Sequence, residues 1–228
     1  MKLFTWNVLH RVHAEVHGEP CIVHWADEKT RVDAVVAAVR ALNCDVGLLQ
    51  EVSGDVVAAL RSAFPERAVL SHLYPRVPKR SVTGVKDRTE HLVVLAPAGA
   101  KVKRASTYES DPGKGFLAVD VDGVTLISTH VSWGEKRADQ LITLRETVAS
   151  IGGRCVVGGD FNIEREVVEP ALGAKCVVLP SGSLPTRDQG TGPGLMIDHL
   201  LGFGVELRDA RVEAHRNESD HRPVSARL

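Results

Sequence analysis

Short apolar stretches of strand length recur along this sequence, and they restrict its fold more than any other feature. Four of them follow one another in the middle of the chain, at residues 91–95, 101–108, 115–121 and 124–130. Asp122–Gly123, between the last two, is a strong hairpin signal. Further strands are expected at residues 1–8, 44–49, 154–158, 195–201, 205–214 and 224–228. The chain is therefore expected to be rich in strands.

Helical spacing of apolar residues appears between some of these strands. The predicted helices cover residues 30–42, 54–63 and 136–150. Helices at the edges of two strand-rich halves predict an α/β (α+β) fold built as a layered sandwich. Residues 74–88 are basic and rich in proline, which favours a long surface loop.

Size and charge exclude several classes of protein. With 228 residues and 43% hydrophobic content, the chain can bury one large core, so we expect a single domain over residues 1–228. The 28 basic and 29 acidic residues nearly balance, so no general positive field can collect long nucleic acid. The four cysteines form no CxxC pair, and no apolar run has the character of a signal peptide or membrane span. We expect a cytoplasmic monomer without a membrane partner.

Polar residues stand at the ends of five of the expected strands, and a sixth site lies inside a strand. That residue, Asp198, is surrounded by apolar neighbours in the sequence, where a carboxylate needs a charged or donating partner. The set consists of Asn7, Glu51, His130, Asp160, Asn162, Asp198, Asp220 and His221. It predicts a catalytic site assembled from distant segments.

Each side chain of this set has a use in the hydrolysis of a phosphate ester. Glu51 offers a hard carboxylate oxygen of the kind that Mg²⁺ binds. Asp160 can orient or deprotonate an attacking water, and the amides of Asn7 and Asn162 can donate to phosphate oxygens.

Two histidines complete this chemistry. His221 can donate to the phosphoryl group, with Asp198 as the candidate carboxylate that fixes its tautomer and keeps it cationic. His130 can hold negative charge near the leaving oxygen or protonate it, with Glu90 as the candidate orienting partner.

Some of these residues also have ordinary structural explanations. Asp160 could cap a helix that starts near Ile163. The basic loop from Arg76 to Arg88 is most simply a solvated face, with phosphate recognition as the alternative. A solvated or gating role on a loop is favoured over zinc binding for His10, His13, His17 and His24.

Six segments, in order, resemble the motifs of the endonuclease/exonuclease/phosphatase superfamily, which has the fold of deoxyribonuclease I and exonuclease III. The segments are Thr5-Trp6-Asn7-Val8, Leu49-Gln50-Glu51-Val52, Ser128-Thr129-His130, Gly159-Asp160-Phe161-Asn162, Ile197-Asp198-His199 and Ser219-Asp220-His221-Arg222-Pro223. The resemblance implies a four-layer α-β-β-α sandwich of two mostly antiparallel sheets. It also implies a hydrolase of phosphate esters that depends on Mg²⁺ or Mn²⁺.

The same resemblance implies roles for single residues. Glu51 would be the principal metal ligand, with Asn7 beside it and Asp220 as a further acidic residue near the metal. The implied catalytic residues are Asn7, His130, Asp160, Asn162, Asp198 and His221. The substrate would contact Asn7, His130, Asn162, His221 and Arg137.

Finer motif details resemble one branch of the superfamily, which holds poly(A) deadenylases, nocturnin-like phosphatases and 2′,3′-cyclic-phosphate phosphatases. The segment Asn7-Val8-Leu9 and the spacing of His130 and Arg137 carry this likeness. Relatives of exonuclease III usually have an acidic residue where this chain has Leu9, which disfavours abasic-site repair.

A nearly neutral chain of this size fits an RNA end, a nucleotide or another small phosphate ester better than a long duplex. Trp133 is the aromatic residue we expect at the substrate, with core packing as its alternative, and the other candidates are Trp25, Tyr74 and Tyr108. Two other functions stay open. One is a phosphatase of a non-nucleotide phosphate such as a phosphoinositide or sugar phosphate, and the other is a non-catalytic module that binds phosphate or RNA.

Overall fold

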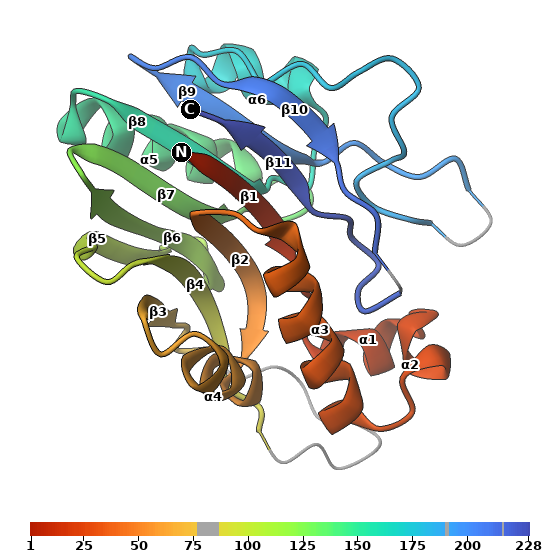
Figure 1. The fold of residues 1–228 in the computed structure, drawn as a ribbon. Coiled ribbons are helices and arrows are strands. Elements are labelled where there is room, and N and C mark those ends of the chain that lie inside the picture. Colours follow the sequence, from red (N-terminus) through yellow and green to blue (C-terminus); the bar gives the residue numbers. More distant parts are fainter. Residues whose placement is uncertain (77–86, 190–191, 216) are drawn as a thin grey trace.

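Two stacked β-sheets form the centre of the computed structural model, which describes residues 1–76, 87–189, 192–215 and 217–228 (Figure 1). In spatial order, the strands of the first sheet are β10 (Arg208–Val212), β11 (Val224–Arg227), β1 (Lys2–Asn7), β2 (Val46–Ser53), β4 (Glu90–Pro97) and β3 (Arg67–Leu73). Those of the second sheet are β5 (Lys101–Tyr108), β6 (Asp111–Val121), β7 (Val124–His130), β8 (Cys155–Asp160) and β9 (Asp198–Phe203). Only the pairs β1·β2 and β7·β8 are parallel among these strands. The prediction of two mostly antiparallel sheets is confirmed.

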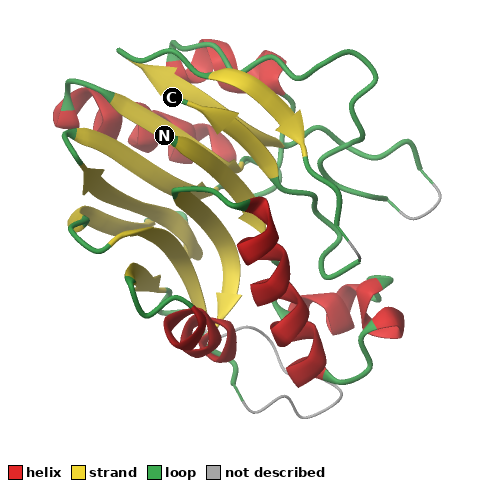
Figure 2. Ribbon diagram, in the orientation of Figure 1, coloured by secondary structure: helices red, strands yellow, loops and turns green. Residues whose placement is uncertain are grey.

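Helices cover the outer face of each sheet (Figure 2). The first sheet carries α3 (Glu28–Leu42) and α4 (Gly54–Ala63), and the second carries α5 (Arg137–Ile151) and α6 (Arg165–Leu172). Alternation along β1 shows how one strand serves two layers, because Phe4 and Trp6 pack with the helices while Leu3 packs between the sheets. The α-β-β-α sandwich is thus confirmed.

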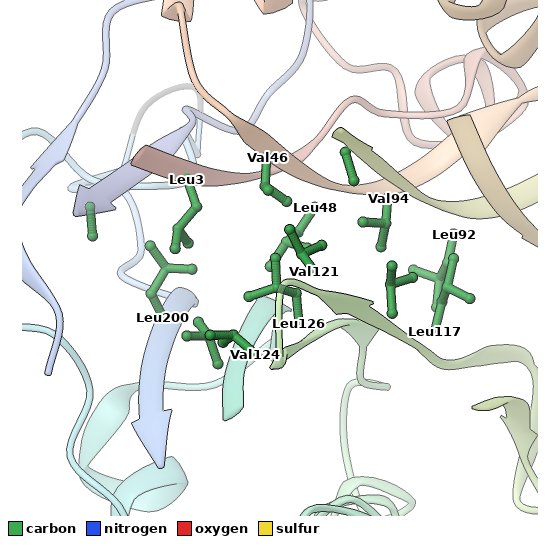
Figure 3. Close-up of a cluster of buried hydrophobic side chains, with 14 of the residues drawn as sticks. Leu3, Val46, Leu48, Leu92, Val94, Leu117, Val121, Val124, Leu126 and Leu200 are labelled. Carbon is green, nitrogen blue, oxygen red and sulfur yellow. The ribbon is translucent and has the colours of Figure 1, made fainter. Parts of the chain in front are cut away.

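A cluster of buried apolar side chains lies between the two sheets (Figure 3). Leu3 and Leu48 of the first sheet meet Leu126 and Leu200 of the second, and all four side chains are fully buried. Burial of each such leucine contributes about 2 to 3 kcal/mol. This packing fixes the two sheets against each other and therefore the relative position of their strand ends.

Several predicted bounds are confirmed and a few elements were not foreseen. The bounds predicted for α4, β5 and β7 agree with the structure. The edge strand β3 escaped prediction because its residues are only half-buried and carry no clear apolar alternation. The short helices α1 (Arg11–His17) and α2 (Cys21–His24) replace an expected loop.

Local capping explains why α1 forms despite its length. The His10 side chain accepts a hydrogen bond from the Val12 N–H, and Gly18 ends the helix in a left-handed conformation. Of the expected basic loop, residues 77–86 lie outside the described part of the chain. In the part that is described, no helix combines the length and the apolar character that a membrane span requires.

Candidate active site

The ends of the central strands bring the predicted polar residues together. Asn7 ends β1, Glu51 lies near the end of β2, and His130 pairs with Asp160 across the parallel strands β7 and β8. This last approach needs Gly159, because a Cβ atom there would lie 1.9 Å from the carbonyl oxygen of Thr129. A pocket of about 230 Å³ opens at these ends. Its lining includes Asn7, Glu51, His130, Trp133, Asp160, Asn162, Asp220 and His221.

Unusual backbone conformations aim three residues of the pocket. Leu9, Glu51 and Asn162 have φ angles of 56°, 54° and 53°, in the left-handed region that residues with a side chain rarely adopt. Glu51 lies where the register between β2 and β4 shifts, as in a β-bulge. Strain of this kind persists where the surrounding structure holds it, and it is common at functional sites.

Asp160 occupies the centre of the pocket floor. Its Oδ2 accepts a hydrogen bond of 3.0 Å from the Asn7 amide and lies 3.3 Å from His130 Nε2, and its Oδ1 accepts from the Asn162 N–H. Burial opposes its ionisation, but the nearby imidazoles of His221 and His130 outweigh burial and hold the pKa of Asp160 far below its usual value. The helix-cap explanation is wrong, because α6 starts at Arg165 with Glu164 as its N-cap.

His221 and Asp198 form the predicted pair. His221 Nδ1 donates to Asp198 Oδ2 at 2.9 Å, and both side chains are buried. Burial disfavours the cation, but Asp198, Asp220 and Asp160 outweigh it and raise the pKa of His221 to about 10. His221 is therefore a cation at neutral pH, with its Nε2 directed 3.8 Å from Asp160 Oδ2.

Glu51 lies on the other side of the pocket floor. Its Oε2 accepts a hydrogen bond of 3.2 Å from the His10 N–H, and its Oε1 lies 3.7 Å from His130 Nε2. Burial opposes ionisation here too, but the positive charges of His13, Lys114 and His130 keep the pKa of Glu51 well below its usual range. Glu51 is thus an ionised carboxylate that faces the pocket.

Several charged or titratable residues of the pocket were not predicted to belong to the catalytic site. Lys114 on β6 lies 3.0 Å from His130 Nδ1 and 4.0 Å from Glu51 Oε1. Arg187 donates to Asp220 Oδ2 at 2.9 Å, while Arg76 and His13 complete the lining. Lys114 had one sequence signal, since it is the only basic residue of β6 and stands between two glycines.

Two further predictions about pocket residues are wrong. Glu90 does not orient His130, because its Oε2 accepts a hydrogen bond from His13 Nε2 at 3.0 Å. His10 and His13 are not solvated loop residues either. His10 is fully buried at the start of α1, where its Nε2 contacts the carbonyl of Thr89.

The aromatic and basic candidates separate clearly. Trp133 is 51% exposed and lines the pocket, with the Arg187 guanidinium 5.7 Å from its ring centre, so it is no core residue. Tyr74 and Tyr108 are buried in the cores. Arg137 lies at the start of α5 and is not among the residues that line the pocket.

The residues present fit a divalent cation. Hard oxygen ligands are what Mg²⁺ and Mn²⁺ prefer, and Glu51 supplies an ionised carboxylate at the pocket surface. A second set of donors lies across the floor, where one ligand atom each from Asp160, Asp198 and His221 falls within 4.8 Å of the others. In that set, Asp198 and His221 already bind each other.

The sequence profile of the Endonuclease/Exonuclease/phosphatase family matches residues 4–221. The chain belongs to this family. No curated protein sequence matches it. A solved endonuclease/exonuclease/phosphatase from Bacteroides vulgatus is similar to the chain, with a TM-score of 0.74, 16% identity, and coverage of 99% of this chain and 97% of that one.

Two other solved structures, a phosphatase and a TDP2, have the same fold. A mannosyl-6-phosphatase from Bacteroides thetaiotaomicron has a TM-score of 0.72 and 13% identity, covering 100% of this chain and 99% of its own. A truncated TDP2 from Caenorhabditis elegans has a TM-score of 0.66 and 17% identity, covering 99% and 95%. As a member of the endonuclease/exonuclease/phosphatase family, the chain is a metal-dependent hydrolase of phosphoric esters.

Proposed function

We propose that this hydrolase acts on a phosphate ester at an RNA end or on a nucleotide, with Mg²⁺ or Mn²⁺ as its cofactor. The arrangement around Asp160 supports the reaction best. An ionised, buried carboxylate there accepts from Asn7 and faces the imidazoles of His130 and His221. Buried charges are costly to a fold, so a cluster of this kind that opens into a pocket points to catalysis.

Each residue has one task in this proposal. Glu51 would hold the divalent ion, with Asn7 and Asp220 nearby, and the ion supplies neutralisation of the negative charge on the phosphate. Asp160 orients the attacking water and takes its proton as the bond to phosphorus forms. His221, held cationic by Asp198, donates to a non-bridging oxygen of the phosphoryl group.

The amide of Asn162 and the imidazole of His130 are the remaining groups that would contact the phosphate. Asn162 Nδ2 lies 3.4 Å from His130 Nε2, so the two side chains can donate to neighbouring oxygens of one phosphoryl group. Asn7 keeps the Asp160 carboxylate in place through its own amide. Asn7 and His130 are the last residues of β1 and β7, and Asn162 follows the end of β8 by two residues.

The rim of the pocket supports a nucleotide or an RNA end as substrate. Trp133 exposes half of its surface there, and stacking of a base on an aromatic ring contributes about 1 to 3 kcal/mol. Arg187 lies over the same ring and can meet a second phosphate. A chain with a formal net charge of −1 would collect a short end rather than a duplex, and we propose that it acts as a monomer.

A non-nucleotide phosphate is the second candidate substrate. The pocket measures only about 230 Å³, which suits a small ester such as a sugar phosphate. Arg76, Lys114 and Arg187 supply positive charge on its walls without any need for a base. The alternative of a non-catalytic module has less support, because the acids, amides and imidazoles are all present in the pocket.

A substrate screen tests the proposal. The purified protein with Mg²⁺ or Mn²⁺ is assayed on RNA with 2′-, 3′- or cyclic-phosphate ends, on mononucleotides, and on sugar phosphates. We expect turnover of a nucleotide ester, and loss of at least about a thousandfold in kcat in Asp160→Asn, which keeps the shape but cannot take the proton. Equal activity of wild type and Asp160→Asn on every ester would refute the proposal.

A further inference from the structure

A second pair of a carboxylate and an imidazole lines the same pocket. His13 of α1 and Glu90, the first residue of β4, form it through the 3.0 Å hydrogen bond from Nε2 to Oε2. Glu90 is fully buried, whereas the His13 side chain is 21% exposed and reaches the pocket surface. The arrangement repeats that of Asp198 and His221, in which a buried acid also holds a histidine at the pocket.

The buried carboxylate of Glu90 depends on His13 as its hydrogen-bond partner. A buried carboxylate costs several kcal/mol unless it is paired, and Glu90 Oε1 finds no hydrogen-bond partner among the described residues. The neighbouring His10 cannot take the place of His13, because both of its ring nitrogens bond to backbone groups of Val12 and Thr89. His13 is therefore the imidazole that this acid orients.

The charged groups that act most strongly on His13 differ from those that act on Asp160, apart from Lys114, so the two residues lie in different parts of the pocket. Glu51, Glu90 and Lys114 are the charged groups that act on His13, together with the ring of His10. The charges that act on Asp160 belong to His221, His130 and Lys114. In the hydrolysis of a phosphate ester, the attacking water and the leaving oxygen are in line with phosphorus and lie on opposite sides of it.

We propose that His13, oriented by Glu90, is a catalytic residue that protonates the leaving oxygen of the substrate. The inference rests on the proposed function, in which Asp160 activates water at the other end. Water oxygen bonds to phosphorus and its proton passes to Asp160, while the bond from phosphorus to the leaving oxygen breaks with its electron pair on that oxygen. Since Glu90 engages Nε2, the proton that completes the leaving hydroxyl comes from His13 Nδ1–H.

Protonation and access both suit this task. Burial disfavours the cation, but the carboxylates of Glu51 and Glu90 outweigh it and raise the pKa of His13. Within the described part of the chain, His13 Nδ1 makes no hydrogen bond, which leaves its proton available to a ligand.

His130 and Lys114 are the competing proton donors, and their surroundings favour other tasks. His130 Nε2 lies 3.3 Å from Asp160 Oδ2 and 3.4 Å from Asn162 Nδ2, at the water side of the site. Lys114 lies against His130 and Glu51, where a fixed positive charge suits the phosphate itself.

The test compares two esters of one nucleotide, a dinucleotide whose leaving group is a ribose hydroxyl and a p-nitrophenyl ester whose phenolate leaves without a proton. For His13→Gln we expect kcat on the dinucleotide to fall about a hundredfold and kcat on the p-nitrophenyl ester to fall at most about threefold. The half-saturating Mg²⁺ concentration should not rise, because the charge that His13→Gln removes near Glu51 is positive. His24→Gln, an exposed histidine of α2 outside the pocket, serves as the matched control and should change neither rate.

Glu90→Gln gives a second measurement with the imidazole kept. Without the carboxylate the pKa of His13 falls, so the alkaline limb of kcat on the dinucleotide moves to lower pH while the p-nitrophenyl profile stays in place. Equal losses on both esters in His13→Gln, or a leaving-group effect in Lys114→Met instead, would overturn the assignment of His13 alone. A wild type that hydrolyses neither ester at any metal concentration overturns the proposed function and the inference with it.

Discussion

The floor and the rim of the pocket are built from different parts of the molecule. The floor consists of side chains at strand ends, such as Asn7, Glu51 and Asp160, held by two sheets with fully buried cores. The rim consists of His13 on a short helix and of Trp133 and Arg187 on connecting segments. The direction of a side chain at a strand end is fixed by the sheet. The position of a rim residue depends instead on helix caps and ion pairs. The contrast suggests that the floor holds the metal and activates water, whereas the rim contacts the leaving group and the rest of the substrate.

Replacement of Glu51 should give the largest effect on metal use. Glu51→Gln keeps the shape and the hydrogen bond from the His10 N–H but removes the charge that holds a hard cation. We expect the half-saturating Mg²⁺ or Mn²⁺ concentration to rise on the order of a hundredfold, measured by activity and by titration calorimetry of Mn²⁺.

A carboxylate of the rim provides the control for this change. Glu19 lines the same pocket and pairs with Arg187 at 3.3 Å. Glu19→Gln therefore removes the same charge as Glu51→Gln, but from the rim. If floor and rim divide the work as stated, Glu19→Gln leaves the metal requirement as it is. A similar rise in both variants would show that the metal responds to the net charge of the pocket and not to Glu51.

Replacement of Asp198 should lower kcat about 10- to 100-fold, because it orients a catalytic group without touching the substrate. The sign of the pH effect follows from the raised pKa of His221. On the p-nitrophenyl ester, which does not need a proton from His13, activity needs the His221 cation and is lost as pH rises through its pKa, about 10 in the wild type. Asp198→Asn removes the largest favourable charge, so the alkaline limb of the pH profile should move to lower pH.

Stability gives an independent measure of the same pair. A group with a raised folded-state pKa stabilises the fold fully below its unfolded pKa, about 6.5 for histidine, and loses this contribution as pH rises to the folded value. Thermal melts should therefore show that the wild type loses stability between pH 7 and pH 10. The loss of stability should be smaller in Asp198→Asn. Asp188→Asn, which removes an acid bound to Arg222 away from the floor, should keep the wild-type slope. If the pH profile of activity is unshifted in Asp198→Asn, then Asp198 does not set the pKa of His221.

The same division explains how much the sequence alone could predict. Apolar alternation and the Asp122–Gly123 turn were enough for the central strands, and a polar residue after each strand indicated the floor. Arg187 lies far from any strand end in the sequence and reaches the pocket through its bond to Asp220. His13 needed knowledge that α1 forms, which depends on a histidine cap and on Gly18, and neither is a strong local signal.

The wrong pairing of Glu90 with His130 has the same origin. Glu90 and His130 are each at the end of a central strand, so adjacency at one edge of the sandwich made them a reasonable pair. The structure instead brings His13 of α1 to the acid. Strand order could not predict which of several histidines a buried carboxylate would bind.

The smallest effect, and the one that tests the rim, is expected for Trp133. Trp133→Ala removes the exposed ring that lies beside Arg187, and loss of about 1 kcal/mol of stacking should raise KM for a nucleotide ester about fivefold with kcat unchanged. Trp133→Phe keeps an aromatic face and should restore most of the affinity. KM for a sugar phosphate should not change in either variant, because that substrate has no base. A rise in KM for both substrates would mean that Trp133 supports the pocket and does not read the nucleotide.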